Sequence, residues 1–321
     1  MADYLTPAVA LVTALLQAAV FAALAPLFTG WVKRIKCYLQ NRQPPVFFQP
    51  YRDLRRLFVK EIVLAHNASV VFRMAPYIVC GTAIMAAGVI PFITVRIPMA
   101  AVADVIVLVG MFALGRFFLA LAGLDVGTSF GGMGSSREMT IAALAEPAML
   151  MVVFTLAMLA SSTNLSTIVS YILNVELALR PSLLFALLAL ILVAIAETGR
   201  FPVDNPATHL ELTMIHEAMI LEYTGRHLAL MELAAQIKFT IYTVLIINLF
   251  FPWGISQSYA PIAMTFAFCA VAAKMAVAGA LLAVSETLMA KMRLFRVPTF
   301  LAVAFTLALI GMLSFIMLEG K

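Results

Sequence analysis

The chain has 321 residues, of which 64% are hydrophobic and only 12% are charged, and its mean hydropathy is +1.03. Soluble domains contain about 25% charged residues, so this composition excludes a soluble globular protein and indicates an integral membrane protein. The net charge of +5 is interpreted as a topology signal, and no nucleic-acid partner is expected.

Eight apolar runs are long enough to cross a bilayer, which takes roughly 20 apolar residues. They lie near 6–29, 73–95, 102–124, 139–161, 181–200, 230–252, 261–285 and 298–318. The first run is longer than the core of a signal peptide and lacks a basic leader, so it is expected to be retained as a span. The pattern predicts one all-α membrane domain over residues 1–321, with about eight transmembrane helices.

Most of the 21 Lys and Arg residues fall in the connections after the first, third, fifth and seventh runs. The opposite connections and the C-terminus hold only Arg96, Arg180 and Lys321. Such a bias marks the cytoplasmic side of a membrane protein. It predicts a multi-pass protein of the cell (inner) membrane with both termini on the outer, periplasmic side.

The first connection, residues 31–72, contains "YRDLRRLFVKEIVLA". Leu54, Leu57 and Phe58 recur at helical spacing, and basic residues occupy mostly the other faces. This pattern predicts a short amphipathic helix along the cytoplasmic surface. The helix either anchors to lipid headgroups, or it roofs a cavity or docks a soluble partner.

The second cytoplasmic connection, "GLDVGTSFGGMGSSRE" at residues 123–138, is rich in glycine. No strand precedes it and no GK[ST] follows, so it is not a phosphate-binding loop. We expect a tight loop whose glycines let a partner's backbone approach closely.

The third connection concentrates ionisable groups in a chain that is otherwise strongly hydrophobic. It covers residues 196–225, "AETGRFPVDNPATHLELTMIHEAMILEYTG". Pro202 and Pro206 prevent one uninterrupted helix, and helical character resumes from Thr208. The connection is predicted to line a polar chamber at the membrane surface. Its ionisable candidates are Glu197, Arg200, Asp204, His209, Glu211, His216, Glu217 and Glu222.

Metal and cofactor sites find little support in the sequence. His209 and His216 share a helical face, but neither belongs to an HExxH motif. The three cysteines, Cys37, Cys80 and Cys269, are scattered, whereas iron–sulfur clusters use about four clustered thiolates. We therefore expect neither a metal nor a redox cofactor in this chain.

Ionisable residues inside the apolar runs cost ~2.5–3.5 kcal/mol or more each and are functional candidates by default. Three glutamates approach the cytoplasmic ends of their spans, and each either holds a mobile proton or pairs with a nearby Arg or Lys such as Arg116 or Arg137. Lys238 and Lys274 are likewise relay members or structural partners, Arg116 is expected to snorkel part of the way to the surface, and Asp104 to cap its helix. The three glutamates are Glu146, Glu197 and Glu286.

The three cytoplasmic connections together resemble subunit 1 of respiratory complex I, and most of all its homologues in membrane-bound nickel–iron hydrogenases, including the energy-converting, carbon-monoxide-linked and formate hydrogenlyase types. The resemblance implies a membrane-arm subunit that couples electron transfer in a peripheral arm to proton (or sodium) translocation. It implies as partners the hydrogenase large and small subunits, an iron–sulfur subunit and antiporter-like membrane subunits. The nickel–iron centre and iron–sulfur clusters would lie in those partners.

The resemblance also assigns residues to two groups. The relay or coupling group takes Glu146, Glu197, Asp204, Glu211, Glu222, Glu138 and Asp125, to which the residue chemistry adds Glu217, Lys238 and Lys274. The chamber or partner-facing group takes Arg42, Gln49, Arg52, Asp53 and Arg137, to which the residue chemistry adds Arg200, His209 and His216.

Local departures separate this chain from some of these relatives. Ala207 and His209 stand where quinone-reducing relatives usually have further acids, which favours the hydrogenase branch, and "GTSF" replaces the "GSPF" of formate hydrogenlyase relatives. Two alternatives stay open: a quinone-chamber subunit of a complex I type enzyme, and a purely structural membrane anchor.

Overall fold

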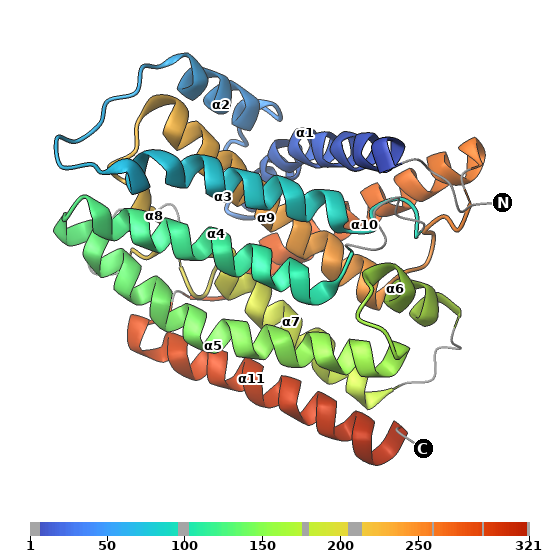
Figure 1. Ribbon diagram of the computed structural model, residues 1–321. Coiled ribbons are helices and arrows are strands. Elements are labelled where there is room, and N and C mark those ends of the chain that lie inside the picture. Colours follow the sequence, from blue (N-terminus) through green and yellow to red (C-terminus); the bar gives the residue numbers. More distant parts are fainter. Residues whose placement is uncertain are drawn as a thin grey trace.

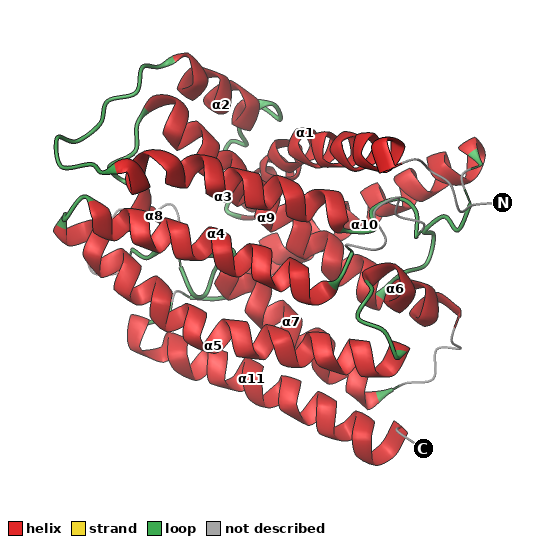
Figure 2. Ribbon diagram, in the orientation of Figure 1, coloured by secondary structure: helices red, strands yellow, loops and turns green. Residues whose placement is uncertain are grey.

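The protein is a bundle of long helices, seen in a computed structural model that describes residues 7–95, 103–174, 180–204, 214–258, 260–290 and 292–319. Figures 1 and 2 show the long helices lying side by side, joined by short helices and loops. Among the described residues, seven helices are long and apolar enough to cross a membrane. They are α1 (Pro7–Leu39), α3 (Val70–Val89), α4 (Val105–Asp125), α5 (Ser129–Ala160), α9 (Gly225–Phe250), α10 (Pro261–Leu288) and α11 (Val297–Ser314).

An eighth apolar helix, α7 (Pro181–Glu197), has 17 residues, the short end of the ~17–25 that span a bilayer. It packs against α5, α9 and α11 within the bundle, so the expected all-α membrane fold is confirmed. The remaining elements are α2 (Gln49–Val59), α6 (Leu165–Asn174), α8 (His216–Ile220), a 3₁₀ turn (Leu294–Arg296) and a π turn (Phe315–Glu319).

The two ends of the bundle differ in character. The start of α1 and the end of α11 lie at one end, whereas α2, α8 and the α4–α5 turn lie at the other (Figure 1). We call the latter the α2 end. Since the first and last spans begin and finish at the same end, an even number of crossings is consistent with the fold.

The amphipathic helix expected in the first connection is α2. Leu54 on α2 is buried, whereas Arg52, Arg55 and Arg56 face outward. The helix packs on α9 and on α1, where a Cβ at Gly30 would lie only 2.9 Å from the carbonyl oxygen of Phe47. Of the two expected roles, this contact supports roofing the bundle.

Two boundaries differ from expectation because helix packing overrides local composition. Helix α1 continues through the basic residues to Leu39, about ten residues beyond the predicted end of the first span. Helix α5 starts at Ser129, so the predicted glycine-rich loop is wrong for residues 129–138. Only residues 126–128 separate α4 from α5, and the side chain of Thr128 caps α5 by accepting from the amide of Gly131 at 3.3 Å.

The glycines of this region serve helix packing within the chain. A Cβ at Gly131 would clash with the carbonyl oxygen of Gly123 on α4. A Cβ at Gly134 would lie 2.9 Å from the Cβ of Ala218 on α8. The sequence predicted that a partner's backbone would approach these glycines closely. In the structure, α4 and α8 of the same chain make that approach.

Replacing Gly131 by alanine is expected to destabilise the protein by about 1–3 kcal/mol, the usual cost of overpacking. The added methyl group would force α4 and α5 apart at the point where they turn. Gly132 is the matched control, since a Cβ there meets nothing within 4 Å. The melting temperature of the purified protein should fall for Gly131→Ala and stay unchanged for Gly132→Ala. Equal melting temperatures of the two variants would contradict this packing role.

Asp104 caps its helix, as expected. Its Oδ1 accepts from the amide of Ile106 at 2.7 Å at the start of α4, and its Oδ2 accepts from the hydroxyl of Thr163 at 2.7 Å. The residue thereby ties α4 to the segment before α6 at the end opposite α2.

Candidate functional site

The centre of the bundle contains one buried guanidinium that contacts three carboxylates. Arg116 projects from α4 with only 4% of its side chain exposed. Its Nη2 pairs with Oε1 of Glu197 on α7, and its Nη1 donates to Oε1 of Glu146 on α5 at 3.0 Å. Its Nε lies 3.7 Å from Oε1 of Glu138, also on α5. The planar fork of an arginine, with its five N–H donors, can serve several acceptors at once.

A second cation completes the group. Lys238 on α9 donates from Nζ to Oε2 of Glu197 at 2.9 Å, so Glu197, with 2% of its side chain exposed, is held by both cations. We call Arg116, Lys238, Glu138, Glu146 and Glu197 the Arg116 cluster. It joins α4, α5, α7 and α9, and it sets three carboxylates against two basic side chains.

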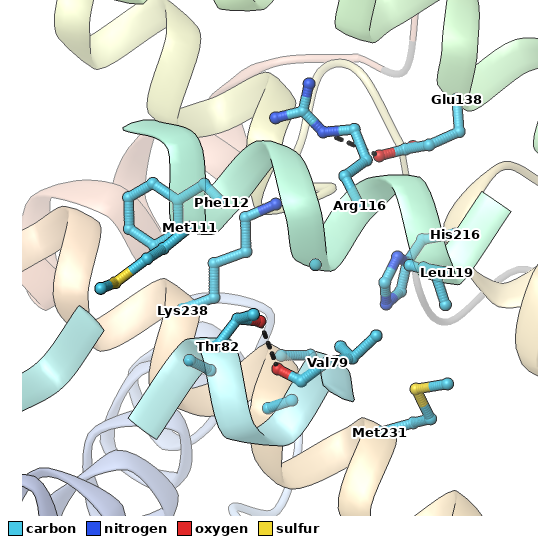
Figure 3. Close-up of a pocket in the computed structure, with 14 residues that line it drawn as sticks. Val79, Thr82, Met111, Phe112, Arg116, Leu119, Glu138, His216, Met231 and Lys238 are labelled. Atoms are coloured by element: carbon cyan, nitrogen blue, oxygen red, sulfur yellow. Dashed lines mark hydrogen bonds and ion pairs between the residues drawn. The ribbon is translucent and has the colours of Figure 1, made fainter. Parts of the chain in front are cut away.

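A small cavity of about 50 Å³ adjoins this cluster. Its polar wall includes Arg116, Lys238, Glu138, Thr82 and His216, and the rest of its lining is largely apolar. Figure 3 shows Glu138 pointing toward Arg116, with His216 beside Leu119 on another side of the space. The volume and the polar groups suit a few ordered water molecules.

The third connection approaches this cavity from the α2 end. His216 begins α8 and lines the cavity. Burial, reinforced by the positive charge of Lys238, lowers the pKa of His216, although Glu217 and Asp204 oppose the shift. Neutral imidazole is therefore the favoured form at pH 7.

The other acids of the third connection are placed at varying depth. Asp204 is 3% exposed and accepts from the amide of Ile215 at 3.3 Å, which closes the connection on itself. Glu217 and Glu222 are partly buried at α8 and just after it. His209 and Glu211 lie outside the described residues.

A second, separate ion group lies where α10 meets α1. Glu286, with 2% of its side chain exposed, pairs with Nζ of Lys36 at 2.9 Å and with Nη1 of Arg200 at 3.5 Å. The guanidinium of Arg200 stacks on the ring of Phe239 at 4.0 Å. We call Glu286, Lys36 and Arg200 the Glu286 clamp; Glu286 thus has the basic partners that structural pairing requires.

Several other predicted residues have local contacts at the α2 end. Nη1 of Arg137 donates to the carbonyl of Met214 at 2.7 Å and so holds the third connection against α5. Asp125 accepts from the amide and hydroxyl of Ser69 at 2.8 and 2.6 Å, next to the start of α3. Gln49 donates to Asp53 within α2 at 2.8 Å, and Arg42 and Arg52 are exposed.

Lys274 is not brought to the Arg116 cluster. Its Nζ donates to the carbonyl of Phe251, just beyond the end of α9, at 2.7 Å. The expectation that Arg116 snorkels is wrong, because three carboxylates on neighbouring helices hold its head inside the bundle. The alternative that Glu146 and Glu197 pair with Arg116 is confirmed. The additional contact of Arg116 with Glu138 was missed, because helix rotation decides which carboxylates face the guanidinium.

A family model and several known proteins match most of this chain. The family model described as NADH dehydrogenase matches residues 11–317. Formate hydrogenlyase subunit 4 of Escherichia coli (strain K12) is 31% identical over 94% of this chain and 97% of its own length. Hydrogenase-4 component C of the same organism is 36% identical over 76% of each chain. An NADH-quinone oxidoreductase subunit of Salinibacter ruber is 26% identical over 68% of this chain and 66% of its own.

A solved structure shares the fold. A chain of the membrane-bound sulfane sulfur reductase, an archaeal respiratory membrane complex, superposes with a TM-score of 0.80 over 95% of this chain and 98% of that one. Its sequence identity is 16%, so it supports the fold alone. With the family model matching nearly the whole length, the chain belongs to the NADH dehydrogenase family of complex I subunit 1-like membrane proteins.

Proposed function

We propose that this chain is the membrane-arm subunit of a nickel–iron hydrogenase complex, which anchors the peripheral redox arm and couples its electron transfer to proton (or sodium) translocation. Two of its relatives are the formate hydrogenlyase and hydrogenase-4 subunits, each matched over most of the chain. The observation that carries the coupling role is the Arg116 cluster, where three buried or partly buried carboxylates face two cations.

The charge count of this cluster supports a proton-binding role. With all three carboxylates ionised, the cluster carries one excess negative charge in a medium that stabilises charge poorly. Binding one proton makes it neutral. The proton belongs to the coupled group rather than to one residue.

A continuous set of groups links the α2 end to the cluster. His216 and Glu138 both line the water-sized cavity, and Glu138 contacts Arg116, which contacts Glu197 and Glu146. Glu146 has 36% of its side chain exposed against 2% for Glu197, so it provides the exit toward a neighbouring membrane subunit. Glu138 and Glu146 are eight residues apart on α5, about 12 Å along the axis.

Coupling then requires only that the redox state of the partner changes the proton affinity of this group. A redox event can move protons if protonation differs between the two states. A change of charge or geometry in the third connection would reach the cluster through His216 and the cavity.

The α2 end is the proposed docking surface for the peripheral arm, with the exposed Arg42 and Arg52 as contacts for an acidic partner surface. The positive-inside bias supports a cytoplasmic location for this end, with both termini on the outer side of the cell (inner) membrane. The expected partners are the hydrogenase large and small subunits, an iron–sulfur subunit and antiporter-like membrane subunits. The nickel–iron centre and iron–sulfur clusters are assigned to those partners.

The subunit inventory of the complex tests this proposal. The tagged chain, purified from gently solubilised membranes, is expected to bring down a nickel-containing large subunit and hydrogenase activity, and to show no such activity alone. A quinone-chamber role is the second candidate, since the Salinibacter ruber relative is a quinone oxidoreductase subunit. Recovery of NADH-oxidising subunits, bound quinone and inhibition by quinone-site blockers would decide for that candidate.

A further inference from the structure

A large apolar groove separates α10 from α7 and α9, away from the Arg116 cavity. It has a volume of about 820 Å³, within the ~300–1,000 Å³ of ordinary ligand pockets. Helix α10 is held mainly on its other side by α1, where Nε1 of Trp31 donates to the carbonyl of Ala276 at 3.1 Å. The apolar walls come from all three helices and include Leu187, Ile191, Ile246, Val277 and Leu281.

One cation faces this groove without a carboxylate beside it. Lys274 lines the groove, and its Nζ donates to the carbonyl of Phe251. In the part of the chain that the structure describes, no acidic side chain lies within ion-pair distance of it. An ammonium inside an apolar span is costly, so this site favours an anion supplied from outside the chain.

Lys274 lies midway along α10 but contacts the end of α9, where an aromatic side chain indicates a membrane surface. Trp253 lies just after the end of α9, lines the groove and is 47% exposed. Tryptophan gathers at the level of lipid headgroups, where its N–H meets polar groups and its ring meets the chains. Lysine side chains near such a level extend toward the headgroups.

The groove is long enough for an acyl chain of one leaflet. Along α10 its lining extends from Lys274 to Met289, fifteen residues or about 22 Å along a helix rising ~1.5 Å per residue. This length exceeds half of the ~30 Å hydrocarbon core, which is about 15 Å. The Glu286 clamp lies beside the Met289 end of the groove.

We propose that this groove is a binding site for an anionic phospholipid of the leaflet opposite the α2 end. The phosphate pairs with Lys274 and accepts a hydrogen bond from Trp253, and the acyl chains run along α7, α9 and α10 to the Glu286 clamp. Charge-assisted hydrogen bonds to phosphate are shorter and stronger than neutral ones. The lipid thereby fills the space that keeps α10 from packing directly against α7.

Lipid retention in the purified complex tests the site. Mass spectrometry of the complex is expected to find co-purifying phosphatidylglycerol or another anionic phospholipid, and Lys274→Gln is expected to lose most of it. Lys274→Arg should retain it. Lys60→Gln is the matched control, since Lys60 is an exposed lysine at the end of α2, and it should retain the lipid as the unmodified complex does.

Adding lipid back separates the possible sources of the anion. For the delipidated complex, dioleoyl phosphatidylglycerol should raise the melting temperature by several degrees, and Lys274→Gln should abolish this shift. Dioleoyl phosphatidylcholine and inorganic phosphate alone should give little shift. Equal stabilisation by phosphatidylcholine, or unchanged lipid retention in Lys274→Gln, would overturn the proposal.

A second measurement excludes a protein occupant. In a chain carrying Cys37→Ser and Cys269→Ser, the variant Leu281→Cys bearing a photo-crosslinker is expected to label lipid. Crosslinking to a helix of a partner subunit would show that protein fills the groove and would also overturn the proposal.

Discussion

Replacing Arg116 by methionine is expected to destabilise the protein by about 3–5 kcal/mol, the cost of removing one partner from a buried ion pair. Methionine fills similar space without charge, so the loss measures the electrostatic role of the guanidinium. Glu138, Glu146 and Glu197 would then share Lys238 as the only remaining cation of the cluster. The expected readouts are a lower melting temperature of the purified complex and less of the chain in the membrane.

Two variants sharpen this test. Arg116→Lys keeps the charge but offers a compact ammonium that cannot contact three carboxylates at once, so an intermediate loss is expected. Arg73→Met removes an exposed arginine of α3 and should leave melting unchanged. If Arg116→Met melted like the unmodified protein, the cluster would not be the electrostatic centre of the bundle.

Replacing Glu197 by glutamine is expected to uncouple ion translocation from hydrogen turnover while the complex still assembles. Glutamine keeps the shape and can hydrogen-bond, but it leaves two carboxylates facing two cations, so the cluster no longer has an excess negative charge to bind a proton. Coupling free energies of ~1–3 kcal/mol correspond to about 5–150-fold changes in proton affinity. The number of protons translocated per hydrogen is therefore expected to fall toward the background level in sealed vesicles, measured beside hydrogen turnover.

The matched control is another buried glutamate outside the Arg116 cluster. Glu286→Gln should weaken the clamp between α10 and α1 and lower thermal stability, with a much smaller loss of translocation per hydrogen than Glu197→Gln. Should vesicles with both Glu146 and Glu197 neutralised pump normally, the chain would be a structural anchor and the relay would be rejected.

The sequence predicted the helices better than the contacts between them. The apolar runs and the 3.6-residue spacing around Leu54 were sufficient for the spans and for α2, because composition and periodicity are local properties. Glu197 and Lys238 stood out for the same reason, as charges in oily runs. Their pairing at 2.9 Å depends on the rotation of α7 against α9, which no single segment encodes.

The differences between expectation and structure share one physical cause, which is the packing of helices against each other. Gly131 and Gly134 suggested a loop because glycine is a poor helix former, by about 1 kcal/mol relative to alanine. In the fold, the missing side chains allow α4 and α8 to approach α5, and this packing outweighs the propensity. Lys274 was grouped with the relay by its charge, whereas its helix packs mainly on α1 and leaves it beside the groove.

Two charged groups meet at the end of α7. Glu197 belongs to the Arg116 cluster and Arg200, only three residues later, to the Glu286 clamp, while the adjacent Lys238 and Phe239 of α9 contact the same two residues. A proton arriving at Glu197 therefore alters the field at the root of α10 across barely one helical turn. A change of charge at the innermost acids therefore acts on the clamp that holds α10, and a change at the clamp acts on those acids, through the electrostatic field alone.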